Sequence, residues 1–274
     1  MRPLTSDDLP HADALFNAAY GRRGGLGEAG RRYLAWQPDG WLLAELSGQP
    51  VGMVYAVRYD RFAYVGVMAV PPSAQRRGVG RALMTRLLTD LEAHAVGTVR
   101  LDATPEGAAL YRHFGFVEEG TKTLYRRAEA VRGELVGMRP LRRGDLLALT
   151  AFDAPKFGAA RDHVLRTLCE AYPERAFVSR RAGGVSGYVV ASPRSIGPWV
   201  ADDSRTAEQL LLCALALPFE TEPSVIAPDA NTAAGTLLAR YGFRVVRRTV
   251  HMRRGSETPI DYAKLYAQVS FAVG

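Results

Sequence analysis

The stretch Gln75-Arg76-Arg77-Gly78-Val79-Gly80 combines residue types and spacing that point to phosphate chemistry. It follows an apolar run at residues 62–70 and opens an amphipathic segment at residues 78–94. The start of a helix carries unpaired backbone N–H groups and a partial positive charge, both of which favour an anion. Two glycines let a phosphate reach the backbone, and Arg76, Arg77 and Arg81 add charge. The pattern predicts a pyrophosphate cradle, although a short Gly-rich turn alone can be an ordinary loop.

Alternating and helical hydrophobic patterns predict the elements that position this cradle. We expect helices at residues 6–20, 78–94 and 105–114, and a loop at residues 21–30. Strands are expected at residues 41–46, 51–59, 62–70, 98–103, 116–119 and 123–127. This order predicts an α/β fold of the α+β type, a twisted mixed sheet flanked by helices.

The chain also repeats itself. Met1-Arg2-Pro3-Leu4 returns as Met138-Arg139-Pro140-Leu141, each followed by an Asp-Leu pair, and Gly115-Phe116 returns as Gly242-Phe243. Echoes in the same order indicate a duplication. We predict a first domain at residues 1–130, a second at residues 136–256 and a tail at residues 257–274, with a boundary near residues 128–135.

The cradle, together with Leu110-Tyr111 and Gly115-Phe116, resembles the GNAT superfamily of N-acetyltransferases over residues 1–130. The second half resembles the degenerate C-terminal domain of tandem members, through residues 196–201 and 252–255. The resemblance implies two tandem GNAT-like domains. It also implies an acetyl-CoA-dependent N-acetyltransferase that moves an acetyl group to a primary amine.

The resemblance assigns roles to particular residues. Backbone groups of Met68 and Val70 would pair with the pantetheine arm of coenzyme A. Tyr111 would protonate the leaving thiolate as general acid. The pyrophosphate would be held by the segment Gln75, Arg76, Arg77, Gly78, Val79, Gly80 and Arg81. The resemblance also implies a contact with the cofactor arm at position 104, where this chain has Thr104 and the family often has Asn.

The reaction also needs an oxyanion donor and a base. A backbone N–H near Ala69 or Val70 suits the developing oxyanion. A simple alkyl amine has a pKa near ~10, so its proton must be removed. Asp102 and Glu45 are the candidates. Asp102 could instead cap the helix that follows it, Glu45 could be a solvated strand residue, and Tyr111 could simply be a half-buried aromatic residue.

The second half lacks the cradle. Its corresponding segment, residues 200–207, has no glycine and contains Asp202 and Asp203, which would repel phosphates. Leu238 stands at the position of Tyr111, and Asn231 at that of Thr104. We expect this half to shape the acceptor pocket or to form a homodimer surface.

The net charge of +7 comes almost entirely from scattered arginines, because only Lys122, Lys156 and Lys264 are lysines. No basic run with interleaved aromatics appears, so we expect no nucleic-acid partner. We also expect no membrane partner, no metal and a cytoplasmic location with free thiols.

The expected acceptor is a small-molecule or peptide amine. The alternative function is a non-catalytic CoA-binding or scaffold protein.

Overall fold

The computed structural model describes residues 1–127 and 138–274, so the predicted boundary near residues 128–135 lies outside the described residues. The first half runs through β1 (Arg2–Pro3), α1 (Leu9–Tyr20), α2 (Glu28–Trp36), β2 (Trp41–Leu46), β3 (Gln49–Arg58), β4 (Ala63–Ala69), α3 (Val79–Ala93), β5 (Thr98–Ala103), α4 (Pro105–His113) and β6 (Val117–Arg127). Helix α2 begins inside the stretch expected to be a loop, because its Tyr33 and Trp36 are buried against the sheet and outweigh the local glycines.

The second half repeats this order. It contains β7 (Arg139–Pro140), α5 (Leu146–Phe157), α6 (Asp162–Ala171), β8 (Ala176–Arg181), β9 (Gly184–Ala191), β10 (Ile196–Ala201), α7 (Ser204–Leu215), β11 (Ser224–Pro228), α8 (Thr232–Arg240) and β12 (Phe243–Gly255), followed by β13 (Leu265–Ala267). No helix of the described chain is long and apolar enough to cross a bilayer.

One repeated ion pair explains why the sequence echo begins each half. Arg2 donates two hydrogen bonds of 2.7 Å to the carboxylate of Asp8, and Arg139 binds Asp145 in the same way at 2.7 and 2.6 Å. Each aspartate also accepts from a backbone N–H three residues earlier. The pair therefore ties the short first strand to the start of the first helix in both halves.

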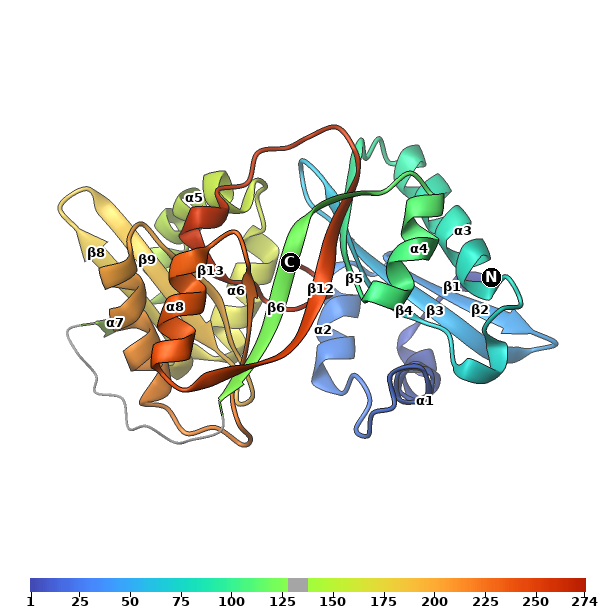
Figure 1. The fold of residues 1–274 in the computed structure, drawn as a ribbon, viewed down its shortest axis with the longest axis horizontal. Helices are drawn as coiled ribbons and strands as arrows, with labels where there is room; N and C mark the ends of the chain where they lie inside the picture. Colours follow the sequence, from blue (N-terminus) through green and yellow to red (C-terminus); the bar gives the residue numbers. More distant parts are fainter. Residues whose placement is uncertain (128–137) are drawn as a thin grey trace.

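The two halves exchange their last strands. In the described part of the chain, one sheet has eight strands in the order β1-β2-β3-β4-β5-β12-β6-β11, and the other has five in the order β13-β10-β9-β8-β7. Strand β12 of the second half lies between β5 and β6 of the first, and β6 in turn pairs with β11 (Figure 1). The two strands expected at residues 116–119 and 123–127 are therefore one continuous strand, because its long partner comes from the other half.

The eight-stranded sheet separates two apolar layers. Helices α3 and α4 cover one face through Leu83, Leu87 and Tyr111, which pack with Val65 and Leu101. Helices α1 and α2 cover the other face, and their core continues into α5 and α6 of the second half. After the roles expected from the sequence, we call the face covered by α3 and α4 the cofactor face and the face covered by α1 and α2 the acceptor face.

Residues 257–274, expected to be a tail, pack into the fold. Strand β13 pairs with β10, and the backbone N–H of Gln268 donates to the carbonyl of Ile226 on β11 at 2.9 Å. Asn231 donates to the carbonyls of Ala263 and Leu265, both at 3.1 Å. The segment thus fills the space between β10 and β11, which corresponds to the space between β4 and β5 in the first half.

Candidate active site

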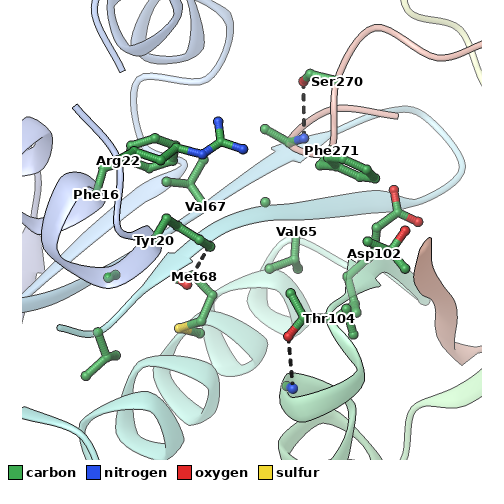
Figure 2. Close-up of a pocket in the computed structure, with 18 of the residues that line it drawn as sticks. Phe16, Tyr20, Arg22, Val65, Val67, Met68, Asp102, Thr104, Ser270 and Phe271 are labelled. Carbon is green, nitrogen blue, oxygen red and sulfur yellow. Dashed lines mark hydrogen bonds between the residues drawn. The ribbon is translucent and has the colours of Figure 1, made fainter. Parts of the chain in front are cut away.

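Strands β4 and β5 separate at the centre of the first half. They pair in parallel only from Ala63 to Val65. A register shift against β3 then places Val67 at φ +46°, a conformation that is rare and strained for a β-branched residue. Strain of this kind persists where the surrounding structure enforces it, commonly at functional sites. A cavity of about 840 Å³ occupies the gap and is lined from both faces of the sheet (Figure 2).

The predicted cradle lies at the end of this cavity on the cofactor face. Gly78 begins α3 with φ +80°, which a side chain rarely adopts, and the space beside its Cα is open. Of the predicted segment, Gln75, Arg76, Gly78, Val79, Gly80 and Arg81 line the cavity, whereas Arg77 does not. Free N–H groups, an open approach and two arginines suit an anionic diphosphate.

The end of β4 also lines the cavity through Met68 and Val70, whereas Ala69 is buried on the acceptor side. The carbonyl of Met68 accepts a hydrogen bond of 2.8 Å from the hydroxyl of Tyr20, and that of Val70 accepts one of 2.9 Å from Gln75 Nε2. Because a carbonyl has two lone pairs, both can still accept from a ligand. The pairing with a pantetheine arm stays a prediction.

Tyr111 lies on α4 at the cavity wall, with 8% of its surface exposed. Its ring packs edge-on against Phe116 with centroids 5.9 Å apart. Burial, and secondarily Tyr20, raises the pKa of the phenol, so the hydroxyl remains protonated at neutral pH. Tyr111 therefore both packs in the core and lines the cavity. The hydroxyl can donate a hydrogen bond to a leaving thiolate, and its role as general acid stays a prediction.

Asp102 reaches the cavity from β5, but its fully buried carboxylate is surrounded by donors. It accepts from Tyr64 Oη at 2.5 Å, His251 Nδ1 at 2.8 Å and Gln268 Nε2 at 3.0 Å. Lys122 Nζ lies 3.5 Å away. Burial alone would raise the pKa of Asp102, but Lys122 and His251 outweigh it and hold the pKa well below its usual value. Asp102 is thus an anion that is poorly suited to accept a proton at neutral pH.

Two further expectations about this region are settled by hydrogen bonds. Asp102 is not a helix cap: Thr104 caps α4, with its Oγ1 accepting from the N–H of Gly107 at 3.1 Å. Thr104 also lines the cavity. Glu45 is not at the cavity; it accepts from Arg2 at 3.0 Å on the β2–β3 hairpin, and the structure does not bring it near Tyr111 or Asp102.

Sequence reasoning missed the residues that the second half contributes. His251 lies opposite Asp102 across the β5–β12 pairing. Arg247 and Thr249 on β12, with Ser270, Phe271 and Ala272 from the C-terminal segment, line the cavity. The Cα of Ala272 lies 2.2 Å from where a Cβ on Gly66 would stand, so a glycine is needed at that point of β4. No local pattern signals these contacts, because they follow from pairing between distant strands.

Comparisons with known proteins agree with the repeated architecture. A model described as the acetyltransferase (GNAT) family matches residues 13–116, and one described as an acetyltransferase (GNAT) domain matches residues 149–267. A holothin acyltransferase from Pseudoalteromonas sp. (strain SANK 73390) is 27% identical over 91% of this chain and 86% of its own length. An uncharacterized N-acetyltransferase from Bacillus subtilis (strain 168) is 27% identical over 84% of this chain and 83% of its own.

A solved structure extends the likeness to the whole chain. The crystal structure of a candidate acetyltransferase from Pyrococcus horikoshii superimposes with a TM-score of 0.87 at 31% identity. It covers 100% of this chain and 95% of that one. The likeness therefore includes both halves and the C-terminal segment.

Proposed function

Because the chain belongs to the GNAT family of N-acetyltransferases, we propose that it transfers the acetyl group of acetyl-CoA to a primary amine at the β4–β5 cavity. The observation that carries the proposal is one continuous cavity that joins the cradle of Gly78 and Gly80 to Tyr111 and then to the acceptor face. The diphosphate of the cofactor would bind at the start of α3, with the thioester in the gap between the strands. The amine would then approach from the opposite face.

The reaction forms a C–N bond and breaks the C–S bond of the thioester. The neutral amine attacks the carbonyl carbon, and a backbone N–H near Ala69 or Val70 would stabilise the oxyanion. As the intermediate collapses, the electrons of the C–S bond stay on sulfur, and Tyr111 would donate a hydrogen bond or proton to the thiolate. Burial raises the pKa of Tyr111, which favours a hydrogen bond from its hydroxyl over full release of the proton.

We assign removal of the ammonium proton to water in the cavity. Only two carboxylates among the described residues line this cavity, Asp102 and Glu106. Asp102 is held ionised by its donors. Glu106 lies in the first turn of α4, on the cofactor face and away from the approaching amine.

We further propose one cofactor site per chain. In the second half, β13 fills the space between β10 and β11, and Asn231 donates hydrogen bonds to the backbone of that inserted segment. Calorimetric titration with acetyl-CoA should therefore give one site per chain. Two equivalent sites, or none, would contradict the proposal.

A paired substitution tests the location of the site. Gly78→Glu puts a negative side chain into the open cradle and should abolish measurable acetyl-CoA binding. Gly48→Glu is the matched control, because Gly48 also has a positive φ, +76°, and open surroundings but lies on the β2–β3 turn. Equal affinities in the two folded variants would place the cofactor elsewhere. An amine screen that follows release of the CoA thiol tests the transfer itself.

A further inference from the structure

Of the residues that the structure describes, five arginines line the cavity, and the cradle accounts for two of them, Arg76 and Arg81. The other three, Arg22, Arg126 and Arg247, come from the α1–α2 loop, β6 and β12. Within residues 1–127 and 138–274, the structure pairs none of these three with a carboxylate within 4.0 Å. Unpaired cations gathered around one cavity repel each other, so their placement calls for a countercharge.

Strand geometry puts these arginines on the acceptor face. Along β12, Val250 and Met252 pack on the cofactor-face core, whereas His251 faces Asp102 on the other side. Alternation then places Thr249 and Arg247 on the side of His251. On β6, Lys122 reaches Asp102 on this same side, and Leu124 and Arg126 follow at intervals of two. The arginines are thus separated by the sheet from the diphosphate cradle on α3.

Arg247 lies directly next to a bulge of β12. The strand keeps a regular register against β6 from His251 back to Arg247, and one extra residue lies between Arg247 and Val245. The guanidinium lies over the ring of Phe271 at 4.9 Å, and its Nε is buried without a hydrogen-bond partner. Burial first, and the charge of Arg22 second, lowers the pKa of Arg247. Its donor group is therefore desolvated and close to a like charge.

Arg22 approaches from the other side of the same space. Its guanidinium lies over the ring of Phe16 at 5.8 Å. Figure 2 draws Phe16, Arg22 and Tyr20 on α1 and the loop that follows it, with Ser270 and Phe271 across the pocket. Cationic groups and aromatic rings therefore line the acceptor side together.

We propose that the acceptor amine carries an anionic oxygen group, a carboxylate or a phosphate, which Arg247 and Arg22 bind, with Arg126 adding charge. Guanidinium groups suit either anion because their paired N–H donors match two oxygens of a planar carboxylate or of a tetrahedral phosphate. Phe16 and Phe271 cover the apolar part of the acceptor. Cationic polyamines are disfavoured because, among residues 1–127 and 138–274, the cavity lining holds no carboxylate on the acceptor face other than Asp102, which is already bound by donors. This inference rests on the proposed transferase function and names its substrate class.

The test uses two matched pairs of amines on the CoA-loaded protein, so that the cradle is already filled. Phenylalanine is compared with phenylalaninamide for the carboxylate, and O-phosphoethanolamine with ethanolamine for the phosphate. Calorimetry measures the dissociation constants without requiring turnover. In at least one pair, the amine that carries the anionic group should bind about 10- to 100-fold more tightly than the partner that lacks this group, the range expected for hydrogen bonds to a charged group. The pair that shows the preference identifies the anion.

Variants of one strand make the test specific. Arg247→Gln should abolish the preference, Arg247→Lys should retain part of it, and the acetyl-CoA affinity of both should match the wild type. Arg248→Gln is the control, because Arg248 is the exposed neighbour on the opposite face of β12. Equal binding of the two members in both pairs, or a preference that survives Arg247→Gln, would overturn the inference.

Two other outcomes separate the inference from the proposed function. If Arg247→Gln weakens acetyl-CoA binding and leaves the anion preference intact, the arginine serves the cofactor and the inference is wrong. If wild-type protein does not bind acetyl-CoA, the proposed function itself fails. Binding of acetyl-CoA together with acetylation only of amines that carry no carboxylate or phosphate would sustain the transferase and refute the anionic acceptor.

Discussion

Replacing Asp102 by Asn tests whether this residue is a structural anion or a catalytic base. The substitution keeps the shape and removes the charge. It leaves Lys122 buried without its counter-ion and puts an N–H₂ group where donors from Tyr64, His251 and Gln268 converge. Removing one partner of a buried ion pair typically costs 3–5 kcal/mol, because the remaining charge stays desolvated. We therefore expect the free energy of unfolding to fall by about 3–5 kcal/mol.

Urea denaturation followed by circular dichroism measures this loss, with Lys122→Met and the double variant completing a cycle. Because the double variant leaves no unpaired charge between positions 102 and 122, its loss should be smaller than the sum of the single losses by about 1–3 kcal/mol. In the folded Asp102→Asn protein at pH 7, turnover should stay within about tenfold of wild type, since removing a general base typically costs 10²–10⁴-fold.

The dependence on pH has a defined sign. The folded-state pKa of Asp102 is lowered, so its stabilisation is complete above the unfolded value of about 3.8 and is lost as the pH falls toward the folded value. The stability gap between wild type and Asp102→Asn should be constant at neutral pH and should narrow in acid. A loss below 1 kcal/mol with additive effects in the cycle would refute the reasoning, as would a gap that widens in acid.

Three other changes give distinct outcomes. Tyr111→Phe should lower kcat by about 10²–10⁴-fold with little change in acetyl-CoA affinity. The control Tyr241→Phe, in the second half, should leave kcat unchanged. Equal kcat values for the wild type and both variants would mean that Tyr111 only packs in the core. Asn231→Ala removes a helix cap and two hydrogen bonds to the inserted segment, so stability in urea should fall by about 2–3 kcal/mol while acetyl-CoA affinity stays unchanged. A fragment of residues 1–127 should lack a cooperative thermal transition, because β12 is absent between β5 and β6; a sharp transition would contradict this.

Local patterns sufficed for the elements around the predicted cradle, whose binding of a phosphate stays a prediction. The strand at Trp41–Leu46 and the helix that begins after Gly78 were predictable because alternation, glycine conformation and helix periodicity are encoded in neighbouring residues. The duplication was visible because Arg2 and Asp8 repeat a bidentate pair. These features depend on short separations along the chain.

The exchange of strands and the surroundings of Asp102 could not be predicted in this way. His251 stands 149 positions from Asp102, and only the register of β12 against β5 brings them together. Arg247 lines the cavity because β12 pairs with β6 at this point, and nothing in the local sequence marks that pairing. Pairing between distant strands thus decides which side chains meet at the site.

The exchange of β6 and β12 also sets an order of events during synthesis. Roughly 115 residues separate the end of β6 from the start of β12. At about 5–20 residues per second, the ribosome needs roughly 6–23 seconds to reach the missing partner. Over that interval the edge of β5 is an open template for any strand nearby, including β12 of another copy of the chain. Slow translation between residues 128 and 242, or several nascent chains on one mRNA, should therefore favour dimers in which β12 of one copy pairs with β5 of another, at the expense of the monomer.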